Sequence, residues 1–170
     1  MPLTLHEAVV PSWLQLLNAG HGWLDKAAAS GIAEEELLSA RLIENMLPFS
    51  YQVKSMTVHS RAAIEGVRAG VFSPDMTPPP ESLAELRAKV DEAIAYLEAL
   101  SPEELDSSAG RDMRFEVGTK RLDFTVQDFL LSFSQPNFYF HATTAYGILR
   151  MKGVGVGKLD YLGRLRLRQG

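Results

Sequence analysis

Apolar residues recur at helical spacing along most of the chain, and this pattern predicts four long helices. The first helix is predicted from about Thr4 to Ser30. Thr4 and Glu7 form a capping-box pattern at its start, and Gly31 is a typical residue for its end. Pro11 lies inside the first turns and predicts a kink there.

A proline-rich connection separates the second and third predicted helices. The second helix is predicted to begin within residues 32–36 and to end at Ala69, with a break or kink at Pro48. Residues 73–80 contain four prolines and cannot be helical, but they are long enough to form a crossover. The third helix, predicted over residues 82–100, has the clearest spacing of apolar residues at intervals of three and four.

Residues 111–125 interrupt the helical pattern and predict a β-hairpin. Met113, Phe115 and Val117 alternate with charged residues, and Gly118 begins a short turn before a second alternating stretch. A single hairpin is only marginally stable in water, so this hairpin is expected to pack on the helices.

The fourth helix is predicted from about Val126 to Lys152 and is the most apolar of the four. Residues 129–149 carry no formal charge and are numerous enough to cross a bilayer. Several polar residues and Pro136 interrupt this run, and a bilayer would leave their polar groups unpaired. We therefore interpret the segment as a helix buried in a protein core, and we expect no membrane association.

Together these elements predict an all-α protein, a four-helix bundle with a small β-hairpin before the last helix. The length of 170 residues suits a single domain spanning residues 1–170. A formal net charge of −4 argues against a nucleic-acid partner. The chain has no cysteine, which excludes disulfides, thiolate nucleophiles and cysteine-based metal sites.

The sequence lacks the common catalytic motifs GxSxG, HExxH and GxGxxG. Residues 153–158 resemble a phosphate-binding loop, but Lys152 and Leu159 stand where that motif needs glycine and Ser or Thr. A flexible end to the fourth helix is the preferred interpretation of this glycine-rich run.

The basic C-terminal tail, at about residues 158–170, supports a separate hypothesis. Arg164, Arg166 and Arg168 alternate with leucines, so an extended tail would align their charges on one side. Such a tail could bind an anionic partner, although a solubilising end is the simpler interpretation.

Two of the four histidines indicate a candidate site. His59 lies midway along the second predicted helix, and His141 lies midway along the fourth, four residues after Asn137. Residues four apart share a helix face, so Asn137 and His141 are expected to project together. Gln52 precedes His59 by one heptad and would line the same groove. The other two histidines are interpreted as surface or packed residues.

These residues leave three interpretations open. His59, Asn137 and His141 could form a structural hydrogen-bond network, because a buried imidazole needs a partner for each ring nitrogen. They could instead bind a metal, zinc or nickel, although an asparagine amide is a weak ligand and catalytic centres usually have three good ones. The third interpretation is a metal-free pocket for a small molecule.

Residues 136–150 resemble the signature of the DUF1993 family, as do residues 45–48 with 52–53 and residues 157–163. Together with the intervening chain, the resemblance spans about residues 3–163. This family is placed in the DinB/YfiT-like superfamily of four-helix bundles. The resemblance, with the absence of a signal peptide, implies a bacterial and cytoplasmic protein.

Many DinB-like proteins bind a divalent metal through one histidine of helix two and an HxxxH pair on helix four. Some are thiol-dependent transferases or isomerases. The resemblance implies that His59 is the helix-two ligand and His141 one of the pair, whereas Asn137 stands where the other histidine is expected. If His141 is taken as the first of the pair, the second is Ala145, which cannot bind a metal. The resemblance therefore implies a degenerate metal site.

These observations lead to two main functional hypotheses. The first is a DinB-like bundle that binds a small molecule or acts structurally, and that forms a homodimer. The alternative is a divalent-metal-dependent enzyme of the thiol-transferase or hydrolase type, in which His59, His141, Asn137 and a water hold zinc or nickel. Neither hypothesis predicts a substrate.

Overall fold

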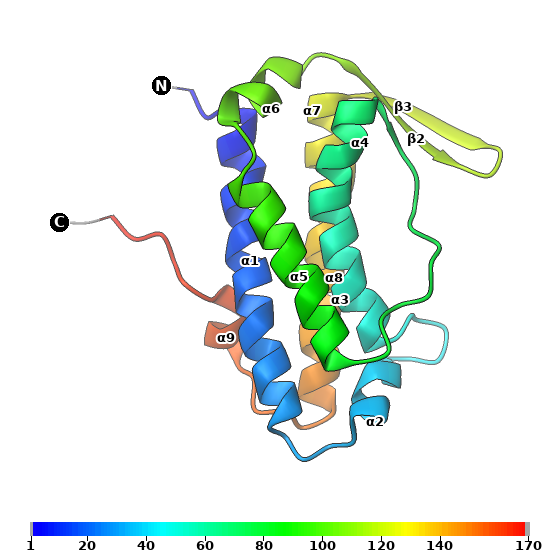
Figure 1. The fold of residues 1–170 in the computed structure, drawn as a ribbon, viewed down its shortest axis with the longest axis vertical. Coiled ribbons are helices and arrows are strands. Elements are labelled where there is room, and N and C mark those ends of the chain that lie inside the picture. Colours follow the sequence, from blue (N-terminus) through cyan, green and yellow to red (C-terminus); the bar gives the residue numbers. More distant parts are fainter. Residues whose placement is uncertain (1, 169–170) are drawn as a thin grey trace.

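The computed structural model describes residues 2–168, and long helical segments that lie side by side form most of it (Figure 1). Two of these segments are single helices, α1 and α5, and the other two are continuous runs of shorter pieces. Their bounds are α1 (Leu5–Ala28), α3 (Phe49–Thr57), η1 (Val58–Ala62) and α4 (Ala63–Ala69), α5 (Leu83–Glu98), and α7 (Val126–Asp128), η2 (Phe129–Ser134) and α8 (Gln135–Met151). We call the two composite segments the second and the last helical segment.

The ends of α1 and α5 agree with the signals in the sequence. Thr4 accepts a hydrogen bond from the Glu7 backbone, and the Glu7 carboxylate accepts one from the Thr4 backbone, so the predicted capping box is present. Ser82 caps α5 in the same way by accepting from the Glu85 backbone. These bonds satisfy backbone donors that the first turn of a helix leaves free. The helix α1 continues past Pro11 and ends two residues earlier than predicted.

The second predicted helix is interrupted more extensively than Pro48 alone suggested. A short helix, α2 (Glu34–Ser39), is followed by the largely irregular residues 40–48, and α3 begins only after Pro48. Proline has no backbone N–H and disfavours a helical residue before it, so it is tolerated at the start of α3 but not within a helix. The segment ends at Gly70, whose φ of +76° is the left-handed conformation typical of a glycine C-cap.

A small three-stranded sheet lies at one end of the helices, so the protein is mostly helical rather than all-α. The strands β2 (Asp112–Val117) and β3 (Lys120–Thr125) form an antiparallel pair within the region of the predicted hairpin. A third strand, β1 (Val71–Phe72), pairs in parallel with β2 and was not predicted. Two residues are too few to show the alternation of a strand in the sequence.

The chain that follows α4 is held against the second helical segment at two points. A Cβ atom at Gly66 would lie 3.0 Å from the Cβ of Phe72, so glycine lets β1 lie directly on α4. Farther along the proline-rich crossover, the buried ammonium of Lys54 donates to the Thr77 carbonyl at 2.6 Å and lies 3.1 Å from Asp75 Oδ1. These contacts hold the crossover close to α3.

Two further short helices complete the structure, α6 (Pro102–Ser108) after α5 and α9 (Lys158–Leu162) near the C-terminus. The start of the predicted basic tail is therefore helical. The Trp23 indole donates to the Asp160 carbonyl at 2.9 Å and stacks on the Tyr161 ring, which attaches α9 to α1. Residues 164–168 are exposed, and the last two residues of the tail lie outside the described part of the chain.

The uncharged run at residues 129–149 forms η2 and most of α8, and its apolar side chains pack into the core. Phe138, Ala142 and Ala145 are among its fully buried residues. None of the helices in residues 2–168 combines the length and the hydropathy that a bilayer crossing requires.

Candidate functional site

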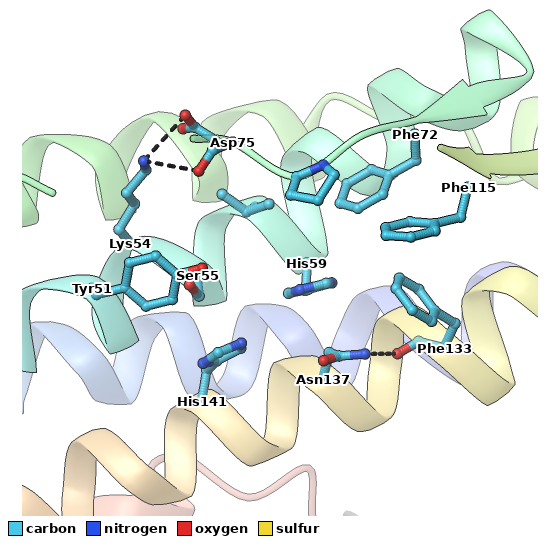
Figure 2. A pocket seen from close by; sticks show the side chains of 12 residues that line it. Tyr51, Lys54, Ser55, His59, Phe72, Asp75, Phe115, Phe133, Asn137 and His141 are labelled. Atoms are coloured by element: carbon cyan, nitrogen blue, oxygen red, sulfur yellow. Dashed lines mark hydrogen bonds and ion pairs between the residues drawn. The ribbon is translucent and has the colours of Figure 1, made fainter. Parts of the chain in front are cut away.

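A cavity of about 210 Å³ lies between the second helical segment, the last helical segment and the chain that joins β1 to the crossover (Figure 2). His59, Asn137 and His141, the three residues selected from the sequence, all line this cavity. His59 comes from η1, whereas Asn137 and His141 lie one turn apart on α8. The fold therefore brings the three predicted residues to one place.

The two imidazole rings face each other across the groove between the helical segments. Their planes are inclined by only 14°, and their centroids are 5.5 Å apart. The edge of the Tyr51 ring lies against His141, with centroids 6.1 Å apart. The two histidines thus form a defined pair in the cavity.

A π-helical turn is present in each of the two segments that carry the site. His59 lies within η1, and η2 ends at Ser134, just before the turn that carries Asn137. The Ser134 hydroxyl donates to the His59 carbonyl at 3.0 Å and joins the two π turns. Single π turns within α-helices are frequent at functional sites. Sequence reasoning missed both turns. No glycine or proline marks η1, whereas Pro136 lacks the N–H that would bond to the Ser132 carbonyl within η2 and was the available signal there.

Gln52 fixes the orientation of His141. Its side-chain amide donates to the Leu47 carbonyl at 2.8 Å, which identifies the other terminal atom as the carbonyl oxygen. That oxygen, Oε1, lies 2.7 Å from His141 Nδ1. An amide oxygen only accepts, so the proton of His141 is on Nδ1 and the lone pair is on Nε2.

His59 lacks such a partner. Its Nδ1 atom is buried, and no hydrogen-bond partner for it occurs in residues 2–168. Burial, with a smaller contribution from the neighbouring His141, lowers the pKa of His59 to about 3, and burial lowers the pKa of His141 to about 4. Both imidazoles are therefore neutral near pH 7, because desolvation disfavours their charged forms.

Asn137 has a fixed orientation as well. Its side-chain NH₂ donates to the Phe133 carbonyl, one turn earlier, at 2.7 Å. Its oxygen lies on the side of the two histidines (Figure 2). The amide therefore offers an acceptor, and not a donor, toward His59 and His141.

A buried ion pair lies at the same cavity and was not anticipated from the sequence. The Lys54 side chain is only 1% exposed, and it donates to Thr77 Oγ1 at 2.9 Å in addition to its contacts with the Thr77 carbonyl and Asp75. Burial opposes ionisation of Asp75, but hydrogen bonds from Thr77 and Lys54 together hold the pKa of this carboxyl below its ordinary value. Lys54 and Asp75 are 21 residues apart, and no local pattern links them.

The other end of the cavity is aromatic. The rings of Phe115 and Phe133 lie 4.9 Å apart between centroids, and the ring of Phe72 lies 6.4 Å from Phe133. His59 contacts this group with ring centroids 5.6 Å from Phe72 and 5.9 Å from Phe133. The cavity therefore has an aromatic end and a polar end, and His59 stands between them.

The comparisons with known proteins agree with this architecture. A family profile described as "Domain of unknown function (DUF1993)" matches residues 5–162. The chain belongs to the DUF1993 family. This DUF1993 protein is also similar to a solved structure, a DinB family member from Shewanella denitrificans, at 28% sequence identity and a TM-score of 0.81. The similarity covers 98% of this chain and 96% of that one, and it supports placement in the DinB-like superfamily. The search of the curated proteins gave no significant match.

The cavity of this DUF1993 protein offers fewer good metal ligands than a three-histidine site. Among residues 2–168, no group of three or more His, Cys, Asp or Glu side chains is arranged to hold a metal ion. The cavity offers two neutral imidazoles and one amide oxygen instead. Imidazole suits zinc and nickel, whereas an amide oxygen is a weak third ligand for them.

Proposed function

We propose that this DUF1993 protein binds a small organic molecule in the cavity, with His59, Asn137 and His141 at its polar end. The observation that carries this proposal is the cavity itself, which brings the side chains of His59, Asn137 and His141 together beside an aromatic wall. A ligand that donates to one of the acceptors there would gain a hydrogen bond worth about 0.5–1.5 kcal/mol.

The dimensions of the cavity support the same proposal. A volume of about 210 Å³ exceeds the roughly 150 Å³ of an apolar cavity that is able to bind benzene. Ligand pockets typically combine apolar walls with a few well-placed polar groups, and this cavity has the aromatic and polar ends described above.

A fragment screen by ligand-observed NMR tests this proposal. We expect hits that lose binding in His59→Ala but keep it in His6→Ala, because His6 lies outside the cavity. Hits that bind both variants equally would place the binding surface elsewhere. An absence of hits would favour the structural interpretation, in which the histidines serve packing and hydrogen bonding.

A second candidate function is a divalent-metal-dependent enzyme of the thiol-transferase or hydrolase type. It is supported by the Gln52 contact, because metal-bound histidines commonly donate their second N–H to an oxygen acceptor, which orients the other nitrogen toward the metal. His59, His141 and the oxygen of Asn137 would hold zinc or nickel together with a water. The chemistry that such a metal supplies is a lower pKa for a bound water or thiol.

Elemental analysis of protein purified without a histidine tag, followed by zinc and nickel titration, tests this alternative. About one metal per chain, lost in His59→Ala and in His141→Ala but retained in His6→Ala, is the expected result. A metal-free protein whose melting temperature responds to neither metal would exclude the alternative, because a ligand of the native state raises that temperature by mass action.

We further propose that this DinB-like chain forms a four-helix bundle that assembles as a homodimer. Three large apolar side chains support the homodimer by their exposure, with Ile43 59%, Phe140 53% and Leu47 46% exposed. Light scattering after size-exclusion chromatography would give twice the mass of the chain, and a clean monomer would refute the homodimer.

A further inference from the structure

Two side chains of α8, His141 and Asn137, have a defined hydrogen-bonding polarity at the cavity, which restricts the chemistry of a ligand that bonds to them. Because the oxygen of Gln52 accepts from His141 Nδ1, the proton of this imidazole is committed. The remaining nitrogen, His141 Nε2, has only a lone pair to offer. A ligand that bonds to His141 must therefore donate.

Asn137 imposes the same requirement. One N–H of its amide donates to the Phe133 carbonyl, and its oxygen lies on the side of the histidines (Figure 2). Two acceptors of fixed polarity thus face the cavity from α8. His59, whose Nδ1 atom has no partner, lies opposite them.

The charges at the cavity are already compensated. Lys54 is the single Lys or Arg among the described residues that line it. The three hydrogens of its ammonium meet the Thr77 carbonyl, the Thr77 hydroxyl and the Asp75 carboxylate. No N–H of Lys54 remains for an anionic ligand, and the carboxylate of Asp75 is not available as the counter-ion of a cationic one. A buried charge without a counter-ion is strongly disfavoured.

The walls and the volume indicate the size of the ligand. Phe72, Phe115 and Phe133 form an aromatic surface beside His59, and aromatic rings prefer offset or edge contacts with one another. A cavity of about 210 Å³ has room for one ring with a short substituent, judged against the roughly 150 Å³ cavity that binds benzene.

We propose that the ligand is an uncharged molecule with one aromatic ring, whose hydroxyl or ring N–H donates a hydrogen bond to the acceptors of His141 and Asn137. This inference rests on the proposed function, namely that the cavity binds a small organic molecule. The aromatic ring would lie against Phe72, Phe115 and Phe133.

Titration of the full chain with four compounds at pH 7, followed by ¹⁵N NMR, tests the ligand class. Phenol is the donor, anisole is the same ring without the donor, and benzoate and benzylammonium carry a negative and a positive charge. We expect phenol to shift the amide signals of the cavity residues and anisole to bind at least about tenfold more weakly, because the acceptors would lack a partner. The two ions should cause no shift at the same concentration.

A pair of matched variants tests whether the preference for phenol over anisole arises in the cavity. Asn137→Leu should reduce the preference for phenol over anisole severalfold. Asn18→Leu should leave it unchanged, because Asn18 donates to the Leu14 carbonyl in the same way but from the exposed face of α1.

The outcomes separate this inference from the proposed function. Equal affinities for phenol and anisole, or binding of either ion as tight as that of phenol, would overturn the ligand class while leaving the cavity a binding site. If none of the four compounds shifts the cavity residues, both the ligand class and the proposed function are contradicted.

Discussion

Acidification should destabilise this protein through His59 and His141 before most carboxylates begin to titrate. Both imidazoles have folded-state pKa values far below the ordinary value of 6.5, at about 3 for His59 and about 4 for His141. Between those values and 6.5 the unfolded chain binds protons that the folded chain does not. The free energy of unfolding therefore falls as the pH falls through this window. It is regained as the pH rises through the same window, and the contribution is complete above 6.5.

The magnitude follows from the number of protons. A histidine that is protonated only in the unfolded chain contributes a slope of about 1.4 kcal/mol per pH unit, so the two together contribute roughly 2–3 kcal/mol between pH 5.5 and 4.5. The Lys54–Asp75 pair faces them across the cavity. The pKa of the Asp75 carboxyl is lowered by its hydrogen bonds from Thr77 and Lys54 rather than raised, so this carboxyl adds no proton uptake in the interval.

Urea denaturation of the metal-free protein in EDTA, at pH values from 7.5 to 4.5, measures this slope. The variant His59→Asn should lose about 1.4 kcal/mol of the change between pH 5.5 and 4.5, and His59→Asn with His141→Asn should lose about twice that amount. His6→Asn serves as the control outside the cavity. If the double variant has the same slope as the wild type, the histidines are not buried in their neutral forms and the reasoning is wrong.

Two further predictions concern the attachment of the crossover and of β1, and both are checked by denaturation midpoints. Lys54→Met should destabilise the protein by about 2–4 kcal/mol, because it leaves the partly buried Asp75 carboxylate without its partner. The control Lys26→Met removes one partner of an exposed ion pair and should cost about 1 kcal/mol or less. Gly66→Ala should destabilise the protein by about 1–3 kcal/mol, because the added Cβ would lie 3.0 Å from the Cβ of Phe72 in β1. The control Gly22→Ala lies on an open helix surface and should stabilise the protein by up to about 1 kcal/mol. Equal effects within either matched pair would contradict these contacts.

The helices could be predicted from the sequence because their signals are local. The capping box at Thr4, the glycine at the end of the second helical segment and the apolar spacing of α5 each lie within a few residues of the element they define. The strand β1 could not be predicted, because it exists only through pairing with β2, about forty residues later in the chain. The short helix α9 also depends on a distant partner, Trp23.

Three residues of the candidate site could be selected from the sequence, but neither their hydrogen bonding nor the Lys54–Asp75 pair beside them could. Helical spacing was enough to select His59, Asn137 and His141, since residues on facing helices of a bundle line a common groove. Spacing says nothing about which atom of Asn137 faces the groove, or which nitrogen of His141 carries the proton. Both depend on single hydrogen bonds, to Phe133 and to Gln52 respectively.

These hydrogen bonds also explain why His59 Nδ1 has no hydrogen-bond partner among the described residues of a well-packed core. Gln52 and Asn137 each donate one amide hydrogen to a nearby backbone carbonyl, at Leu47 and Phe133, and these bonds fix the orientation of both amides. Local contacts on two different helical segments thus leave two acceptors, His141 Nε2 and the Asn137 oxygen, at one cavity. A histidine at position 137 would add an imidazole to the donor set. Asparagine adds only an amide oxygen. The site therefore favours a ligand that donates a hydrogen bond over a metal ion, which would be held by three imidazole nitrogens.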